Sequence, residues 1–217
     1  MKSYLLACLL LISATGMAQS VFPEQLRCEY LSNPKGIDEM SPRLSWTLQS
    51  KDASKFGQRQ TAYNIIVGSS ETELKHNKGS IWNSGWVQSD QMQLITYKGK
   101  DLVSDKSYYW KVRVKDEKGK ESPWSDVAYW STGLLNSSEW TAKWIGSNIT
   151  LNTKDTNCNI PDPWFRKTLD LKSKPSKAVL FIASVGYHEL YVNGKKIGDD
   201  VLAPCVSDHT KCARYVA

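Results

Sequence analysis

The chain has 217 residues, enough for one or two domains. Its 28 basic and 22 acidic residues give a formal charge of +6, but the basic residues are scattered, and a nucleic-acid site would need a basic patch interleaved with stacking aromatic rings. We therefore expect no nucleic acid among its partners. Nine Trp and ten Tyr instead favour β-rich cores, in which large rings pack between sheets.

Residues 1–18 have the features of a secretory signal peptide: a basic Lys2, an apolar run over residues 5–12 and small residues before Gln19. The four residues that end at Cys8 also spell a lipoprotein cleavage box, but the apolar run continues past Cys8, which favours ordinary secretion. No later run approaches the ~20 apolar residues of a membrane span. We expect an exported protein, periplasmic or extracellular, that has no membrane span.

The first expected domain covers residues 22–134 and opens with a strand over residues 26–31 and a turn over residues 33–36. In the next strand, residues 42–48, hydrophobic side chains alternate, which places Trp46 in the core. Further strands are expected over residues 63–67, after residues 81–86 and over residues 94–97, with a short connector of one helical turn over residues 71–75.

Residues 107–115 predict a strand with one buried face and one solvent face, because large apolar and polar side chains alternate there. A polar turn with Gly119 and a further strand over residues 127–130 follow. About seven short strands separated by turn signals predict a fibronectin type III or immunoglobulin-like β-sandwich. The predicted buried face carries Tyr108, Trp110, Val112 and Val114, and the solvent face carries Tyr109, Lys111, Arg113 and Lys115.

Residues 135–163 form a junction between two domains. Trp140, Ala142 and Trp144 alternate, which favours a buried strand face over an exposed aromatic platform for sugars. The rest of the junction, from residue 147, is a polar loop that ends in two prolines.

The second expected domain covers residues 164–217 and holds only about four strands. Residues 164–171 alternate as a strand, and residues 178–185 are apolar on both faces, which predicts a central strand. Asn193-Gly194 between two extended arms predicts a hairpin with a type I′ turn.

The sequence offers no convincing catalytic or metal site. Cys28, Cys158, Cys205 and Cys212 lack the dense spacing of a disulfide scaffold, although the last two could close a small loop. Together with His209 these two match no common zinc pattern, so we expect no metal and no cofactor. Acidic residues around the predicted hairpin are common in exposed turns and need no chemistry; they are Glu189, Asp199, Asp200 and Asp208.

Several segments together resemble the N-terminal portion of bacterial α-L-rhamnosidases, and the resemblance covers essentially all of the chain after the signal peptide. In the first domain they are residues 31–38 (LSNPKGID), 42–46 (PRLSW), 60–63 (QTAY), 82–85 (WNSG), 109–112 (YWKV) and 124–125 (WS). The junction and the second domain add residues 140–145 (WTAKWI), 165–167 (FRK), 186–195 (GYHELYVNGK) and 201–204 (VLAP).

The resemblance implies a fibronectin-like domain, a jelly-roll domain, an α/α toroidal catalytic domain and a C-terminal β-domain. The reaction it implies is inverting hydrolysis of terminal α-L-rhamnosides, with one carboxylic acid on the leaving oxygen and one carboxylate on the attacking water. In the family both groups lie in the toroid, which these 217 residues do not reach. We therefore expect no catalytic residue here, and an all-β fold whose second part is the beginning of a jelly-roll-like sandwich.

Three functional hypotheses follow. The chain is the accessory part of an exported α-L-rhamnosidase that meets rhamnose-containing glycans only through the full-length enzyme, or it is a hydrolase in isolation, or it is a non-enzymatic carbohydrate-binding or cell-surface module. For the third hypothesis, the candidate sugar-binding residues are Trp164 and Tyr187.

Overall fold

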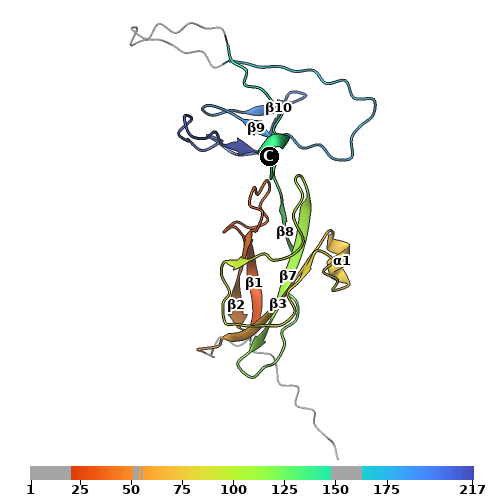
Figure 1. The fold of residues 1–217 in the computed structure, drawn as a ribbon, viewed down its shortest axis with the longest axis vertical. Helices are drawn as coiled ribbons and strands as arrows, with labels where there is room; N and C mark the ends of the chain where they lie inside the picture. The colour runs from red at the N-terminus through yellow and green to blue at the C-terminus, as the bar shows by residue number, and fades with distance from the viewer. Residues whose placement is uncertain (1–20, 51–53, 55, 148–162) are drawn as a thin grey trace, which may run out of the picture. The chain divides into compact units, whose positions relative to one another are not determined.

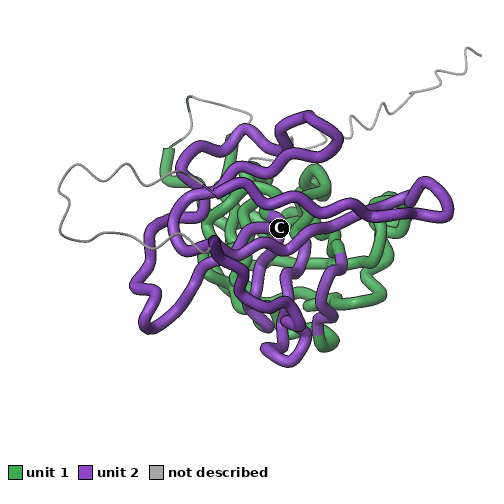
Figure 2. Tube along the Cα trace, turned by 90° about the horizontal axis from the view of Figure 1, so that it is seen from above, with its two compact units in different colours: residues 1–34, 41–101, 107–130 green, residues 35–40, 102–106, 131–217 purple. Residues whose placement is uncertain are grey.

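The computed structural model describes residues 21–50, 54, 56–147 and 163–217. The predicted signal peptide, Cys8, Cys158 and most of the junction loop lie outside the described residues. The chain divides into two compact units (Figure 2). Unit 1 holds residues up to 34, 41–101 and 107–130, and unit 2 holds residues 35–40, 102–106 and 131–217.

Unit 1 is built from two β-sheets (Figure 1). The first sheet has the order β1 (Val21–Cys28), β2 (Arg43–Ser50), β6 (Ile95–Thr96). The second has the order β4 (Trp82–Asn83), β3 (Gln60–Gly68), β7 (Ser107–Asp116), β8 (Ala128–Ser131), and β5 (Val87–Gln88) also pairs with β3. β1 and β8 are therefore the outermost strands on one side of their sheets.

The core of unit 1 lies between these sheets and is rich in aromatic rings. Trp46 of β2 meets Tyr63 of β3 edge to face, with ring centroids 5.4 Å apart. Tyr108 stacks on Trp130 at 5.5 Å, and the whole predicted inner face of β7 is buried. The prediction of an all-β, immunoglobulin-like sandwich with Trp46 in its core is confirmed.

The prediction that Lys111 lies on the solvent face of β7 is wrong, because the exposed fraction of this residue is only 6%. Its Nζ donates hydrogen bonds to the carbonyl of Leu74 at 2.6 Å and to Oδ1 of Asn77 at 2.7 Å. These acceptors belong to the predicted helical turn, α1 (Glu71–Lys75), and to the residues just after it. Lys111 is buried because α1 covers this part of the sheet, and burial lowers the pKa of its ammonium group.

The opening strand also differs from the prediction. β1 begins at Val21 and ends at Cys28, and the chain already turns at Glu29 and Tyr30, before the bends at Asn33 and Lys35 in the predicted turn. Cys28 and Leu31 exchange both backbone hydrogen bonds at 2.9 Å across this two-residue turn. Glu29 and Tyr30 have φ of 47° and 67°, the left-handed values that Asn-Gly normally supplies, so no turn signal marked the site.

The described residues of unit 2 form one 3₁₀ turn, η1 (Ser137–Glu139), and two small antiparallel sheets. One sheet pairs β9 (Ile182–Ala183) with β12 (Tyr215–Val216), and the other pairs β10 (Leu190–Val192) with β11 (Lys195–Ile197). The hairpin predicted at Asn193-Gly194 is confirmed, with φ of 50° and 79° at the two turn residues.

Three other strand predictions in unit 2 are wrong. Residues 164–171 form no strand, and the predicted central strand over residues 178–185 is reduced to the two residues of β9. Residues 140–145 form no strand either: Trp140 packs on Tyr215 with centroids 5.7 Å apart, whereas Trp144 is 64% exposed. A strand is held by its neighbours in a sheet, and no described segment pairs with these residues apart from β12 with β9.

Along the described ranges, no helix has the length and apolar character that crossing a membrane requires.

We predict that Lys111→Ala destabilises unit 1 by about 2 kcal/mol, because it removes the two charge-assisted hydrogen bonds that this buried side chain donates to the Leu74 carbonyl and to Oδ1 of Asn77. Urea denaturation of the chain followed by tryptophan fluorescence measures this, since Trp46, Trp110 and Trp130 are all fully buried in unit 1. Lys118→Ala in the exposed turn after β7 is the control. Equal midpoints for the two variants would contradict the role given to Lys111.

Candidate functional site

The structure leaves the side chains of the two predicted sugar-binding residues exposed. Trp164 is 95% exposed and Tyr187 is 52% exposed, and both lie outside the strands of unit 2. No described hydrogen bond or ring contact fixes the Trp164 side chain. Their role in sugar binding stays a prediction.

Two of the acidic residues around the hairpin of unit 2, Glu189 and Asp208, accept hydrogen bonds from neighbouring side chains. Glu189 accepts hydrogen bonds from Lys196 at 2.5 Å and from Tyr191 at 2.8 Å, one on each carboxylate oxygen. The hydrogen bond from Lys196 is the largest cause that lowers the pKa of Glu189, and hydrogen bonds from Thr210 lower the pKa of Asp208. A general acid needs a raised pKa, whereas the surroundings of these two carboxyl groups lower their pKa.

The cysteines and histidines show no reactive arrangement among the described residues. No group of three His, Cys, Asp or Glu there is placed to hold a metal ion. Cys28, Cys205 and Cys212 are free thiols, and burial raises the pKa of the Cys28 thiol to about 12, which makes it unreactive. His188 Nδ1 lies 2.8 Å from Ser184 Oγ, but this hydroxyl donates its proton to the carbonyl of Gly186.

Unit 1 contains a ladder of alternating cations and indole rings along the outer face of β7. The Arg113 guanidinium lies 4.8 Å from the Trp86 centroid and 4.7 Å from the Trp124 centroid. Lys115 lies 4.4 Å from Trp86, and Lys111 lies 5.2 Å from Trp124. Each ring therefore interacts with two cations.

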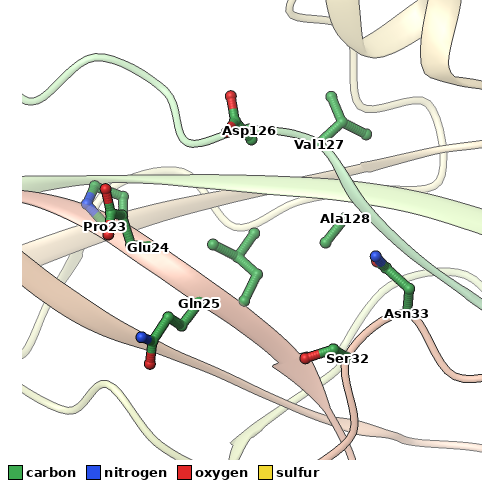
Figure 3. A pocket seen from close by; sticks show the side chains of 9 residues that line it. Pro23, Glu24, Gln25, Ser32, Asn33, Asp126, Val127 and Ala128 are labelled. Atoms are coloured by element: carbon green, nitrogen blue, oxygen red, sulfur yellow. The ribbon is translucent and has the colours of Figure 1, made fainter.

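The candidate site is a hollow of about 300 Å³ in unit 1, between the outermost strands of the two sheets (Figure 3). β1 supplies residues 23–26 on one side, and residues 126–128 at the start of β8 supply the other. Ser32 and Asn33, just after the Glu29-Tyr30 turn, close one end. No sequence pattern marked this hollow, because the segments that line it are about a hundred residues apart in the chain.

Two local features of the backbone shape the hollow. The pairing of β1 with β2 shifts register between Glu24 and Arg27, and Gln25 in this bulge has φ of 51°. Bulges of this kind at the edge of a sheet redirect side chains. At the other end, Asn33 Oδ1 accepts a hydrogen bond of 2.9 Å from the Tyr129 amide, which ties residues 32–33 to β8.

The turn before Ser32 is clamped by an ion pair. Arg43 donates to both carboxylate oxygens of Glu29, with its Nη2 at 2.6 Å from Oε2, and its backbone amide donates to Oε1 at 2.6 Å. The guanidinium also lies 5.5 Å from the centroid of the Tyr30 ring. Hydrogen bonds from Arg43 are the largest cause that lowers the pKa of Glu29.

Polar side chains that face solvent and have few partners within the protein line the hollow. Among the described residues, the side chains of Glu24, Gln25, Ser32 and Asp126 have no hydrogen-bond or ion-pair partner. The Asn33 side chain uses only its oxygen. Leu26 and Val127 add apolar surface. The hollow thus presents donors, acceptors and an apolar wall, which suits a small polar ligand.

An immunoglobulin-like sandwich followed by small antiparallel sheets, with a polar hollow in the first unit, defines an all-β module. The family described as Rha78A-like, N-terminal immunoglobulin domain matches residues 23–136, and the family described as Alpha-L-rhamnosidase N-terminal domain matches residues 173–217. The chain belongs to the family of Rha78A-like N-terminal immunoglobulin domains.

Relatives agree with this assignment. An alpha-L-rhamnosidase of Formosa agariphila is 36% identical over 85% of the chain, which corresponds to 21% of that protein. The solved alpha-L-rhamnosidase of Dictyoglumus thermophilum is 42% identical over 58% of the chain and 14% of its own length, with a TM-score of 0.54. That of Streptomyces avermitilis, complexed with L-rhamnose, is 39% identical over 59% of the chain and 12% of its own, with a TM-score of 0.54. The chain spans about a fifth of the length of the curated relatives it matches.

We predict that the Glu29 clamp stabilises unit 1 above pH 4.5 and loses this effect in acid. The ordinary pKa of the carboxyl is 4.5 and folding lowers it, so the unfolded chain binds the proton more readily and the stabilisation disappears as pH falls through the lowered pKa. Urea denaturation should give a gap between the wild type and Glu29→Gln that is large at pH 7 and small at pH 3.

The matched control is Glu117→Gln, in the exposed turn after β7. It should show little gap from the wild type at either pH. A Glu29→Gln gap that does not shrink on acidification would show that the ion pair is not its source.

Proposed function

We propose that this chain is the N-terminal accessory region of an exported α-L-rhamnosidase that removes terminal α-L-rhamnose from plant-type glycans. The observation that carries the proposal is the match to alpha-L-rhamnosidases at 34–36% identity over most of this chain and about a fifth of theirs. In this proposal the catalytic carboxylates come from elsewhere in a longer protein, and the residues described here form a scaffold.

The electrostatics of the described carboxyl groups support a non-catalytic role. Inverting hydrolysis needs one acid whose pKa is raised so that it holds a proton at neutral pH. Five described carboxyl groups have a lowered pKa instead. These groups are Glu29, Glu73, Glu139, Glu189 and Asp208.

The exposed apolar side chains of unit 2 support a longer protein. Leu169, Leu171 and Val201 are examples of large apolar residues that face solvent there, which a stable isolated domain avoids. We propose that further chain covers them and completes the second domain, residues 164–217. The same proposal takes residues 1–18 as a signal peptide, residues 22–134 as the first sandwich and residues 135–163 as the junction.

The test compares the native protein with the purified chain. An immunoblot of the producing cells, raised against the first sandwich, should show a band far above the 24.5 kDa of this chain. The native protein should hydrolyse an aryl α-L-rhamnoside, whereas the purified 217-residue chain should not. Hydrolysis by the purified chain would overturn the assignment of a scaffold role.

A second function, a carbohydrate-binding or cell-surface module without enzymatic activity, is favoured by the exposure of Trp164 and Tyr187. If these rings bind sugar by stacking, rhamnose should bind weakly and saturably to the chain, and Trp164→Ala should abolish the binding. Trp144→Ala, which removes another exposed indole of unit 2, is the matched control. Equal binding by both variants would exclude Trp164 as the sugar contact.

A further inference from the structure

We propose that the hollow between β1 and β8 of unit 1 binds one neutral glycosyl unit of the rhamnose-containing glycan. The identity of the sugar rests on the proposed function, whereas the site itself rests on the geometry of unit 1. It is separate from Trp164 and Tyr187, which belong to unit 2.

The unused polar groups decide the chemistry of the ligand. Glu24 and Asp126 offer carboxylate acceptors, while the amides of Gln25 and Asn33 and the hydroxyl of Ser32 offer donors. Two carboxylates repel an anion. A cationic group only donates hydrogen bonds and would leave the amide and hydroxyl donors unused. A ligand with several hydroxyl groups both donates and accepts, so it satisfies the whole set.

The size and the apolar wall fit a single sugar ring. A volume of about 300 Å³ lies at the lower end of small-ligand sites. Leu26 and Val127 provide apolar surface against which the methyl group of a 6-deoxy sugar such as rhamnose would lie. No aromatic ring lines the hollow, so stacking is absent and we expect dissociation constants in the millimolar range.

The strained backbone at Gln25 is a second, independent observation. Its φ of 51° is unfavourable for a residue with a side chain, and such outliers persist where the surroundings hold them and often serve a site. Glycine would adopt this conformation without strain. The position nevertheless carries an amide side chain, which lines the hollow.

The test is a titration of the ¹⁵N-labelled chain with methyl α-L-rhamnopyranoside, followed by amide chemical shifts. Saturable shifts are expected at Gln25, Ser32 and Val127. Asp126→Ala should weaken binding at least fivefold. Gln25→Gly should also weaken binding severalfold, but the fold should stay at least as stable, because glycine relieves the positive φ. If Gln25 had only a structural role, binding would not weaken while stability was kept.

A second hollow of the same size offers the matched control. It is lined by Arg59, Gln88 and Asp90 among others, and also measures about 300 Å³. Asp90→Ala and Trp164→Ala should leave the affinity and the shifts at Gln25 unchanged.

The proposal would be overturned if no amide shifts appeared in the hollow at 100 mM glycoside. Equal losses of affinity in Asp126→Ala and Asp90→Ala would also overturn it. So would amide shifts caused by Nα-acetyl-argininamide and not by the glycoside, which would make the hollow a docking site for a basic peptide. Failure here is distinguishable from failure of the proposed function. If the native protein hydrolyses the rhamnoside but the chain shows no shifts, only sugar binding in the hollow is disproved. If the shifts appear but the native protein does not hydrolyse the rhamnoside, only the proposed enzymatic function is disproved.

Discussion

The antiparallel pairing of β3 with β7 is the constraint on which unit 1 depends. It runs from Gln60 opposite Asp116 to Gly68 opposite Tyr109, and every other strand of that sheet is attached to one of these two. Because the pairing fixes which face each side chain takes, it sends Trp110 into the core and Arg113 to the outer face. The aromatic core on one face and the ladder of cations and indoles on the other therefore both follow from the register of the β3–β7 pairing.

Both faces of this sheet are largely covered, which explains where simple alternation succeeds and fails. On the inner face, alternation predicted the buried side chains of β7, because burial there depends on the period of the strand. On the outer face, Lys111 is buried by α1, and Arg113 lies between Trp86 and Trp124. The covering residues belong to segments outside the strand, so the pattern within the strand carries no sign of them.

The same distinction between local and distant causes separates the other predictions. The Asn193-Gly194 hairpin was predictable because the turn residues alone specify it. The Glu29-Tyr30 turn was not, since its left-handed residues are held by Arg43, fourteen residues further on from Glu29. Residues 164–171 and 178–185 have strand-like patterns, but a pattern becomes a strand only when a partner strand is present. The hollow forms only where β1 and β8 lie next to each other, and no local sequence signal specifies that arrangement.

The bulge at Gln25 admits a purely structural explanation, because outermost strands are often kinked to prevent pairing between the edges of two molecules. That explanation accounts for the shift in register but not for the chemistry around it. A protective kink is satisfied by glycine, and it requires no unused donors and acceptors on the facing strand. Here the solvent-exposed side chains of Gln25, Ser32 and Asp126 have no hydrogen-bond partner within the protein, and they come from three segments. Protection of a sheet edge explains the bulge in β1 alone, whereas a bound ligand accounts for the polar side chains of all three segments.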